Sequence, residues 1–180
     1  MESEFVFVAG DPALDLVGTV QRRRTLARDL LRTPADLGAW TAEAGLVDQP
    51  VPAGPEDLEQ ARQLREAVYR LGLAAVAGQP YPTADRRLLN RLADGPVVRL
   101  DLRPDGTLRR TGSAAAVLAG VARSAQELLA LPLGAPIREC AWEPCTRLYV
   151  DRSRRGVRRW CDMSACGNRA KAAAFRERHP

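Results

Sequence analysis

The four cysteines of this chain form two pairs with the same internal spacing. Cys140 and Cys145 stand in "CAWEPC", Cys161 and Cys166 stand in "CDMSAC", and fifteen residues separate the pairs. The first 139 of the 180 residues contain no cysteine. A zinc ion takes four ligands in a tetrahedron, and each short loop can present two thiolates from one turn. The sequence therefore predicts a structural Zn²⁺ site with Cys140, Cys145, Cys161 and Cys166 as ligands.

Two other fates of the cysteines stay open at this point: disulfides, either stable or switching, and plain buried thiols. The N-terminus, "MESEFVFVAGDPALDL", lacks the basic start and long apolar run of a secretory signal. We therefore expect a cytoplasmic protein, in which thiols stay reduced and paired cysteines bind metal or do redox chemistry. No apolar run approaches the roughly 18 residues of a transmembrane helix, so no membrane partner is expected.

Positive charge is concentrated beside the cysteines. The chain has a net charge of +5, yet residues 138–180 alone hold 11 basic and 5 acidic residues, which leaves −1 for residues 1–137. A local excess of this kind indicates an acidic partner, most often nucleic acid. We expect DNA contacts, to phosphates or base edges, from residues of a basic hairpin and a terminal helix, namely Arg154, Arg155, Arg158, Arg159, Asn168, Arg169, Lys171 and Arg176.

The basic residues have two other interpretations. They could form a solvated face that offsets the charge of the thiolates, with Arg169 bonded to backbone or sulfur inside the module. They could instead dock on an acidic protein, which would make the chain a zinc-finger adaptor. Trp142, Tyr149, Trp160 and Phe175 could stack on bases, but in a module of about 40 residues we expect them to form its small core.

Nothing in the sequence predicts an enzyme. His179 is the only histidine, and the chain has no Gly-rich phosphate loop, nucleophile elbow or HExxH motif. Asp11 and Asp15 could form a carboxylate pair, but a helix-capping aspartate and a solvated one are the simpler expectation. Residues 22–24, all arginine, could bind an anion, although we expect an exposed basic run. A homodimer is compatible with the sequence, but no heptad repeat is long enough to predict one.

Residues 1–135 are expected to form a helical domain. Thr33 is followed by Pro34 and, three residues after the cap, by Asp36, which predicts a helix start, and Gly45 predicts its end. Apolar residues recur at steps of three and four over residues 56–77, which predicts a long amphipathic helix.

The rest of the chain is divided by turn residues. We expect a short helix over residues 83–92 capped by Thr83 and a β-hairpin in "VVRLDLRPDGTLRRT". We also expect a helix over residues 113–131, with Val117, Val121, Ala125 and Leu128 along one apolar face. "LPLGAP", residues 131–136, is expected to be a linker. Beyond it, "RLYVD" and "VRRWC" are expected to pair as a hairpin, followed by a helix from about Asn168.

The stretch "CAWEPCTRLYVDRSRRGVRRWCDMSACGNRAK" closely resembles the CGNR zinc-finger module, named for the run seen here as residues 166–169. The preceding region, with "ALDLVGT" and "TPADLGAW", is similar to the ABATE domain that commonly precedes this finger. The resemblance implies a stress-linked transcription regulator of bacterial type, in which the N-terminal domain senses a ligand or signal and the zinc-bound finger binds DNA. One departure is Gly18 before Thr19, where the family often has asparagine.

These inferences combine into a mainly α fold with a β-hairpin, of the α+β class. A helical domain of residues 1–135 would take a small-molecule effector, and residues 136–180 would form a treble-clef-like, four-cysteine zinc finger. In the finger we expect Gly167 to permit a tight turn and Asn168 to cap the helix. Arg169 would then stand one residue into the helix, positioned by the metal site.

Overall fold

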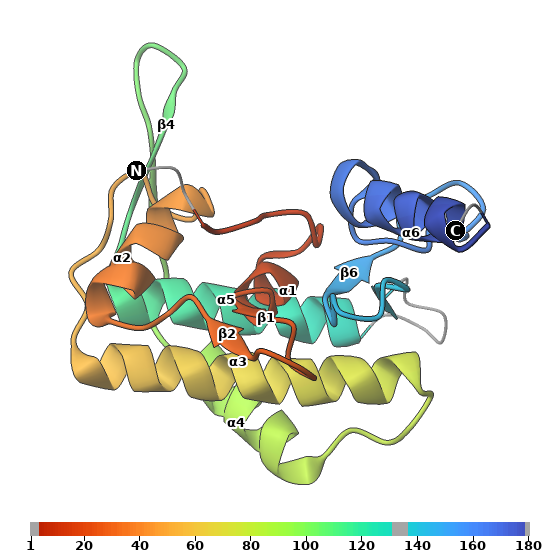
Figure 1. The fold of residues 1–180 in the computed structure, drawn as a ribbon. Helices are drawn as coiled ribbons and strands as arrows, with labels where there is room; N and C mark the ends of the chain where they lie inside the picture. Colours follow the sequence, from red (N-terminus) through yellow and green to blue (C-terminus); the bar gives the residue numbers. More distant parts are fainter. Residues whose placement is uncertain (1–3, 131–136, 179–180) are drawn as a thin grey trace.

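The computed structural model describes residues 4–130 and 137–178 of the chain (Figure 1). Its helices are α1 (Pro12–Val17), α2 (Pro34–Glu43), α3 (Pro55–Val76), α4 (Thr83–Ala93), α5 (Ala114–Leu129) and α6 (Asn168–Arg178), with a π-helical turn η1 (Met163–Gly167) before α6. Its strands form antiparallel pairs: β1 (Val20–Gln21) with β2 (Arg28–Asp29), β3 (Arg99–Leu102) with β4 (Leu108–Thr111), and β5 (Ile137–Glu139) with β6 (Leu148–Val150). The predicted mainly helical α+β class is confirmed.

The helix boundaries follow the capping residues, with one exception. Thr33 Oγ1 accepts the backbone N–H of Asp36 at 3.3 Å, and the Asp36 carboxylate accepts the Thr33 N–H at 2.8 Å, which is the predicted capping box. The prediction that Thr83 caps α4 is wrong. Pro82 occupies the cap position, and its carbonyl accepts from Arg86 at 3.0 Å, so Thr83 is already the first helical residue.

Helices α3 and α5 form the centre of the molecule, and α1 and α4 pack against both. The apolar stripes predicted on the two central helices are buried, through Ala61, Leu64, Val68 and Leu71 on α3 and Val117, Val121, Ala125 and Leu128 on α5. Burying one such Val or Leu side chain stabilises a fold by about 1.5–3 kcal/mol, so this core dominates the stability of the helical part.

One arginine of α3 is buried inside this core. Arg65 is 4 % exposed, and its guanidinium donates to both carboxylate oxygens of Asp29, at 2.7 and 2.8 Å. The same group donates to Thr19 Oγ1 at 3.2 Å. A buried charge needs such a paired and hydrogen-bonded environment, and the pair fixes β2 against α3.

The predicted hairpin of residues 99–111 is confirmed as β3 and β4, and it projects from the helical body (Figure 1). Leu100 and Leu102 of β3 are 60 % and 78 % exposed, so the hairpin contributes little to the core.

The strand pairing in the finger differs from the prediction. β6 pairs with β5, across the first cysteine loop, and not with "VRRWC". The Cys140 N–H donates to the carbonyl of Arg147 at 2.9 Å, which closes that loop and brings Ile137 opposite Val150. Arg158 is not in a strand because its N–H donates to the Asp151 carboxylate at 3.2 Å instead of to a neighbouring strand.

The finger packs directly on the helical part. The Val150 N–H donates to the Ala9 carbonyl at 2.7 Å, and the Arg24 guanidinium pairs with Glu139 at 2.5 Å. Leu148 is fully buried against Gly72 of α3, where an added Cβ would lie 2.6 Å from Leu148 Cδ1. β5, β6 and the cysteines therefore share one buried cluster with the helices.

Some predictions fall on residues that the structure does not describe. The expected linker, residues 131–136, and His179 lie outside the described ranges. Within those ranges, none of the helices has the length and apolar character needed to cross a bilayer.

Candidate metal centre

Each cysteine is held by a local hydrogen-bonded turn. Cys140 directly follows β5, and the Cys145 N–H closes the first loop by donating to the Trp142 carbonyl at 2.8 Å. Cys166 lies in η1, which begins after Asp162, whose carboxylate accepts the Ser164 N–H at 2.8 Å. Two short loops with defined turns thus present the four thiols from opposite sides.

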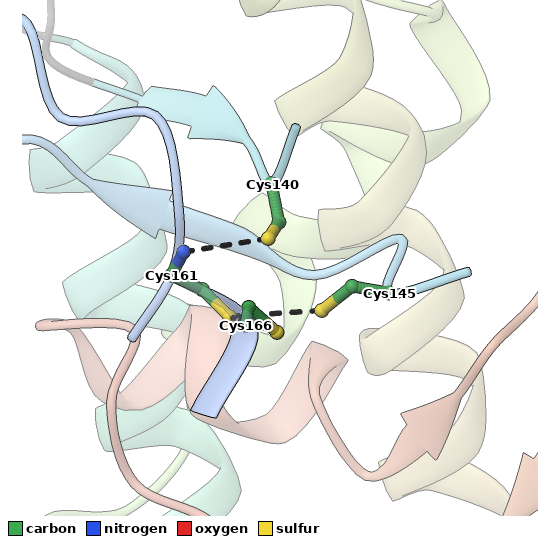
Figure 2. A group of neighbouring side chains, drawn as sticks. All are labelled: Cys140, Cys145, Cys161 and Cys166. Atoms are coloured by element: carbon green, nitrogen blue, oxygen red, sulfur yellow. Dashed lines mark hydrogen bonds between the residues drawn. The ribbon is translucent and has the colours of Figure 1, made fainter. Parts of the chain in front are cut away.

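The four sulfur atoms converge on one point (Figure 2). All lie within 4.8 Å of one another, and the Sγ of Cys161 is 3.6 Å from the Sγ of both Cys145 and Cys166. Four sulfurs bound tetrahedrally at about 2.3 Å from a zinc ion would be about 3.8 Å apart. The spacing of the thiols fits zinc, and none of the four is in a disulfide.

The surroundings of the cluster are suited to thiolates. Cys140, Cys161 and Cys166 are buried. The Cys161 N–H donates to Cys140 Sγ at 3.4 Å, and Arg147 Nη1 donates to Cys161 Sγ at 3.9 Å. Donors of this kind orient the sulfur ligands and offset part of their negative charge.

Without metal, the crowded thiols cannot all lose their protons. Hydrogen bonds from Cys145 and Cys161 lower the pKa of Cys140 to about 2, while the hydrogen bond with Cys140 raises the pKa of Cys161. Burial raises the pKa of Cys166 to about 12. Zinc uptake must therefore release protons from the cluster.

The donor set also limits what the centre can do. Four thiolates close the coordination sphere and leave no position for water, as in structural zinc sites. A bound zinc ion would supply cross-linking of the two loops and, in small modules, roughly 10–16 kcal/mol of apparent binding free energy. Because Cys166 lies in η1, the cross-linked loops would hold η1, and the helix α6 that continues from it, in a fixed orientation.

The start of α6 differs from the prediction. Gly167 is buried but does not adopt a positive φ, so its backbone does not require glycine; an added Cβ would lie 2.9 Å from Sδ of Met163, a flexible side chain that is 47 % exposed. Asn168 is not an N-cap, because η1 continues into α6 and the cap is Asp162. The Asn168 side chain instead donates to the Ser164 carbonyl at 3.0 Å.

The predicted DNA contacts fall into two groups. Arg154, Arg155, Asn168, Arg169, Lys171 and Arg176 are exposed. Arg158 is turned inward: it donates to the carbonyls of Trp160 and Cys161 and lies over the ring of Tyr149, 4.6 Å from its centroid. Arg159 is exposed but covers the ring of Trp160 at 5.2 Å. Arg158 and Arg159 therefore both lie over aromatic rings of the finger.

The aromatic residues divide in a similar way. Tyr149 is fully buried, and Trp142 and Trp160 pack against the core, as expected for a miniature core. Phe175 is 58 % exposed, so the prediction is wrong for this residue. It lies on α6, none of whose residues is buried.

The acidic and basic residues near the N-terminus are only partly as expected. Asp11 caps α1 by accepting the Ala13 N–H at 2.8 Å. Asp15 is not solvated; it is half-buried, it accepts the Ala9 N–H at 3.0 Å, and burial raises its pKa to about 6. Arg23 is not exposed either: it pairs with Glu66 at 2.6 Å.

Two residues of the finger have roles that were not predicted from the sequence, Arg147 and Asp151. Arg147 contacts the cluster, but a single arginine before an apolar strand gives no signal of this. Asp151 is 4 % exposed and accepts from Arg138 Nε at 3.0 Å and from the Ser153 N–H and hydroxyl at 3.0 and 2.6 Å. The Ser153 bonds hold the pKa of Asp151 below its usual range. The "DRS" turn could have predicted this role, because Asp side chains commonly bond the backbone two residues on.

Comparison with protein families agrees with this geometry. The model of the family ABATE, described as "Putative stress-induced transcription regulator", matches residues 10–132, and the model described as "CGNR zinc finger" matches residues 137–179. No curated protein matches the chain. Since the first match spans more than half of the sequence and the second contains the four clustered cysteines, the chain belongs to the ABATE family and carries a C-terminal CGNR zinc finger.

Proposed function

We propose that this protein is a transcription regulator that binds duplex DNA through α6, and that it acts by binding and not by catalysis. The family match and the zinc finger support a regulator with a metal-stabilised module. Four free thiols within reach of one another need a reducing compartment, which supports a cytoplasmic location.

The observation that carries the proposal is the exposure of α6. None of its eleven residues is buried, and only Ala170 and Ala173 are half-buried, so this pair marks the side that faces the rest of the protein. Figure 1 shows α6 at the edge of the molecule, joined through η1 to the cysteine cluster. A helix that is polar and exposed yet anchored at a metal site is suited to present side chains to a partner.

The charges of α6 are arranged for a groove. Successive residues of an α-helix turn by about 100°, so Arg169 and Arg176 form one stripe, and Lys171 and Arg178 form another about 160° away. The major groove of DNA is about 12 Å wide and admits one helix. Two basic stripes on opposite flanks would each face one phosphate wall of such a groove.

Three residues lie between these stripes on the outward side: Asn168, Ala172 and Phe175. All three are exposed. If it exchanges its bond to the Ser164 carbonyl, the Asn168 amide can bind adenine through two hydrogen bonds, and alanine and phenylalanine can contact the methyl group of thymine. This face is therefore the one that we propose reads base edges, while Arg154 and Arg155, in the exposed turn before Gly156, add phosphate contacts.

The proposal is tested by selecting from random duplex DNA with the zinc-loaded full chain and by measuring the affinity for any enriched sequence at several salt concentrations. We expect an enriched motif. Lys171→Ala and Arg176→Ala should each weaken binding to all sequences and lower the slope of log K against log[salt] by about 1. Asn168→Ala should cost about 1–3 kcal/mol and relax the preference at one position.

Arg87→Ala is the matched control, because Arg87 is an exposed arginine on α4, outside the finger. It removes the same charge and should leave the motif and the salt slope unchanged. If the folded, zinc-loaded protein enriches no sequence, or if the α6 variants behave like Arg87→Ala, the DNA proposal fails. Pull-down of an acidic protein through α6 would then favour the adaptor interpretation.

A further inference from the structure

A cavity of about 190 Å³ lies where the helical part meets the finger. Gly18, Val20 and Arg22 border it from the N-terminal side, and Trp142, Arg147 and Arg169 border it from the finger. Of the four cysteines, Cys145 and Cys166 contribute to its wall and Cys140 and Cys161 do not. The cavity therefore borders the metal centre.

The wall of this cavity is rich in arginine. It contains three arginines and one acidic residue, Asp162, whose carboxylate already accepts from the N–H and hydroxyl of Ser164, both at 2.8 Å. In the described part of the chain, no carboxylate forms an ion pair with Arg22, Arg147 or Arg169. Arg147 is already engaged, because it donates to Cys161 Sγ at 3.9 Å and lies near the Asp15 carboxylate, so Arg22 and Arg169 are the arginines of the wall left to bind an anion.

Gly18 makes room for one of these arginines. It ends α1 with ordinary helical dihedral angles, so its backbone does not require glycine. An added Cβ, however, would lie 3.2 Å from Nε of Arg147. It would lie equally close, at 3.2 Å, to the backbone oxygen of Asp15, so a side chain at residue 18 would crowd both the Arg147 guanidinium and the end of α1.

The loops on the two sides of the cavity are held in strained conformations. Arg22 and Thr146 both have positive φ, 52° and 53°, which non-glycine residues rarely adopt. The N–H of Arg23 donates to Thr146 Oγ1 at 3.0 Å, so the two strained residues belong to one hydrogen-bonded junction. Strain of this kind persists where the surrounding structure fixes it, and it clusters at ligand sites.

We propose that this cavity binds a small oxyanion, a carboxylate or a phosphate, between Arg22 and Arg169. The geometry also suits an apolar body on the anion, because Val20 and Trp142 form part of the wall. An apolar cavity of about 150 Å³ is large enough to hold benzene. A site of this size can therefore hold a small aromatic or aliphatic acid, whose carboxylate accepts paired N–H bonds from arginine.

Occupancy of this site has a consequence that depends on the DNA proposal above. Arg169 is at once part of the cavity wall and the first basic residue of α6. An anion bound in the cavity would hold its guanidinium and remove it from the phosphate-facing stripe. The ligand would thus weaken DNA binding, and it would do so by contacting both the N-terminal part and the finger.

Binding is tested by isothermal titration calorimetry of the zinc-loaded full chain with three anionic probes: acetate, benzoate and inorganic phosphate. Benzamide, which has the shape of benzoate without its charge, is the ligand control. We expect at least one anion to bind with a Kd of about 1 mM or lower, and benzamide to bind at least tenfold more weakly. The stronger of benzoate and phosphate identifies the class of oxyanion.

Three variants locate the binding. Arg22→Gln, which lies outside the finger, should weaken anion binding about tenfold or more, as expected for the loss of one charge-assisted hydrogen bond. Gly18→Leu should abolish binding by filling the cavity without changing its charge, and Arg87→Gln on α4 should have no effect. The proposal is overturned if no anion binds, if benzamide binds as well as benzoate, or if Arg22→Gln and Gly18→Leu bind like the unaltered protein.

A second titration, of DNA in the presence of the anion, separates this inference from the DNA proposal. Weaker DNA binding by the unaltered protein but not by Gly18→Leu supports the coupling through Arg169. If the anion binds in the calorimeter and the protein binds no DNA, the site is retained and the DNA function is refuted. If both ligands bind without affecting one another, the coupling is refuted.

Discussion

The contact between Gly72 and Leu148 offers a direct test of how the finger is seated on the helical part. Gly72 lies inside α3, and the fully buried Leu148 begins β6 of the finger. Replacing Gly72 with alanine adds one carbon atom at this junction. Because the change is small and the backbone at residue 72 is helical, its effect depends almost entirely on whether Leu148 is there.

Two opposing effects set the magnitude. Alanine in place of glycine in a helix interior is favourable by about 1 kcal/mol. The new Cβ, however, would lie 2.6 Å from Leu148 Cδ1, whereas carbon atoms in contact are about 3.5–4.0 Å apart. Overpacking of a buried site typically costs about 1–3 kcal/mol. We therefore expect Gly72→Ala to lower the free energy of unfolding by about 1 kcal/mol.

The assay is urea unfolding of the zinc-loaded full chain, followed by circular dichroism and tryptophan fluorescence. Gly120→Ala is the matched control, because Gly120 lies inside α5 and an added Cβ there would meet nothing within 4 Å. It should raise the free energy of unfolding by about 1 kcal/mol. In a Leu148→Ala background the clash is relieved, so Gly72→Ala should become stabilising, with a coupling energy of about 2 kcal/mol.

Equal stabilisation by Gly72→Ala and Gly120→Ala, without coupling to Leu148, would refute the argument. It would mean that Leu148 does not pack on α3, and that the finger is not seated as described. The cavity proposed between Gly18 and Arg147 would then lose its basis as well, since it is formed at the same junction.

Three further predictions concern charges and thiols. Asp29→Ala removes the bidentate partner of the buried Arg65, which keeps its ion pair with Glu66 at 2.9 Å, and should cost about 1–3 kcal/mol in urea unfolding. Asp29→Asn, which keeps one acceptor, should cost less, and negligible effects of both variants would argue against the buried pair. Burial raises the pKa of Asp15 to about 6. The nearby Asp11 carboxylate also raises this pKa, whereas the nearby Arg147 guanidinium lowers it. The stability that protonated Asp15 contributes is therefore present below about pH 4 and is lost as the pH rises through about 6. Asp15→Asn should be the more stable protein near neutral pH and lose this advantage toward about pH 4, whereas a pH-independent difference would exclude the buried carboxyl. Zinc affinity, measured by competition with a fluorescent chelator, should fall on the order of tenfold or more per pH unit below neutrality because the thiols must lose protons; an affinity that does not change with pH would speak against thiolate ligation.

Local patterns in the sequence were sufficient for the elements and for the metal centre. The spacing of apolar residues predicted α3 and α5, and Thr33 with Asp36 predicted the start of α2, because helix periodicity and capping depend on residues close in the chain. The two C-x4-C pairs predicted a four-thiol cluster for the same reason, since each loop closes within itself.

The sequence could not predict which chain segments lie next to each other. β6 pairs with β5 and not with residues 157–161, because the first cysteine loop folds back and Asp151 takes the N–H of Arg158. The Arg158 side chain is turned inward, where it donates to the Trp160 carbonyl, although its sequence context is that of the exposed Arg154 and Arg155.

The tertiary structure alone brought Gly18 and Arg22 to Arg147 and Arg169, which are far apart in the chain. It also buried Asp15 and placed Leu148 on Gly72. Short-range periodicity and capping determine which residues form helices and which thiols meet, since both act within a few turns of chain. Which faces meet depends on close packing over the whole core, and this decided where a cavity with three arginines could remain.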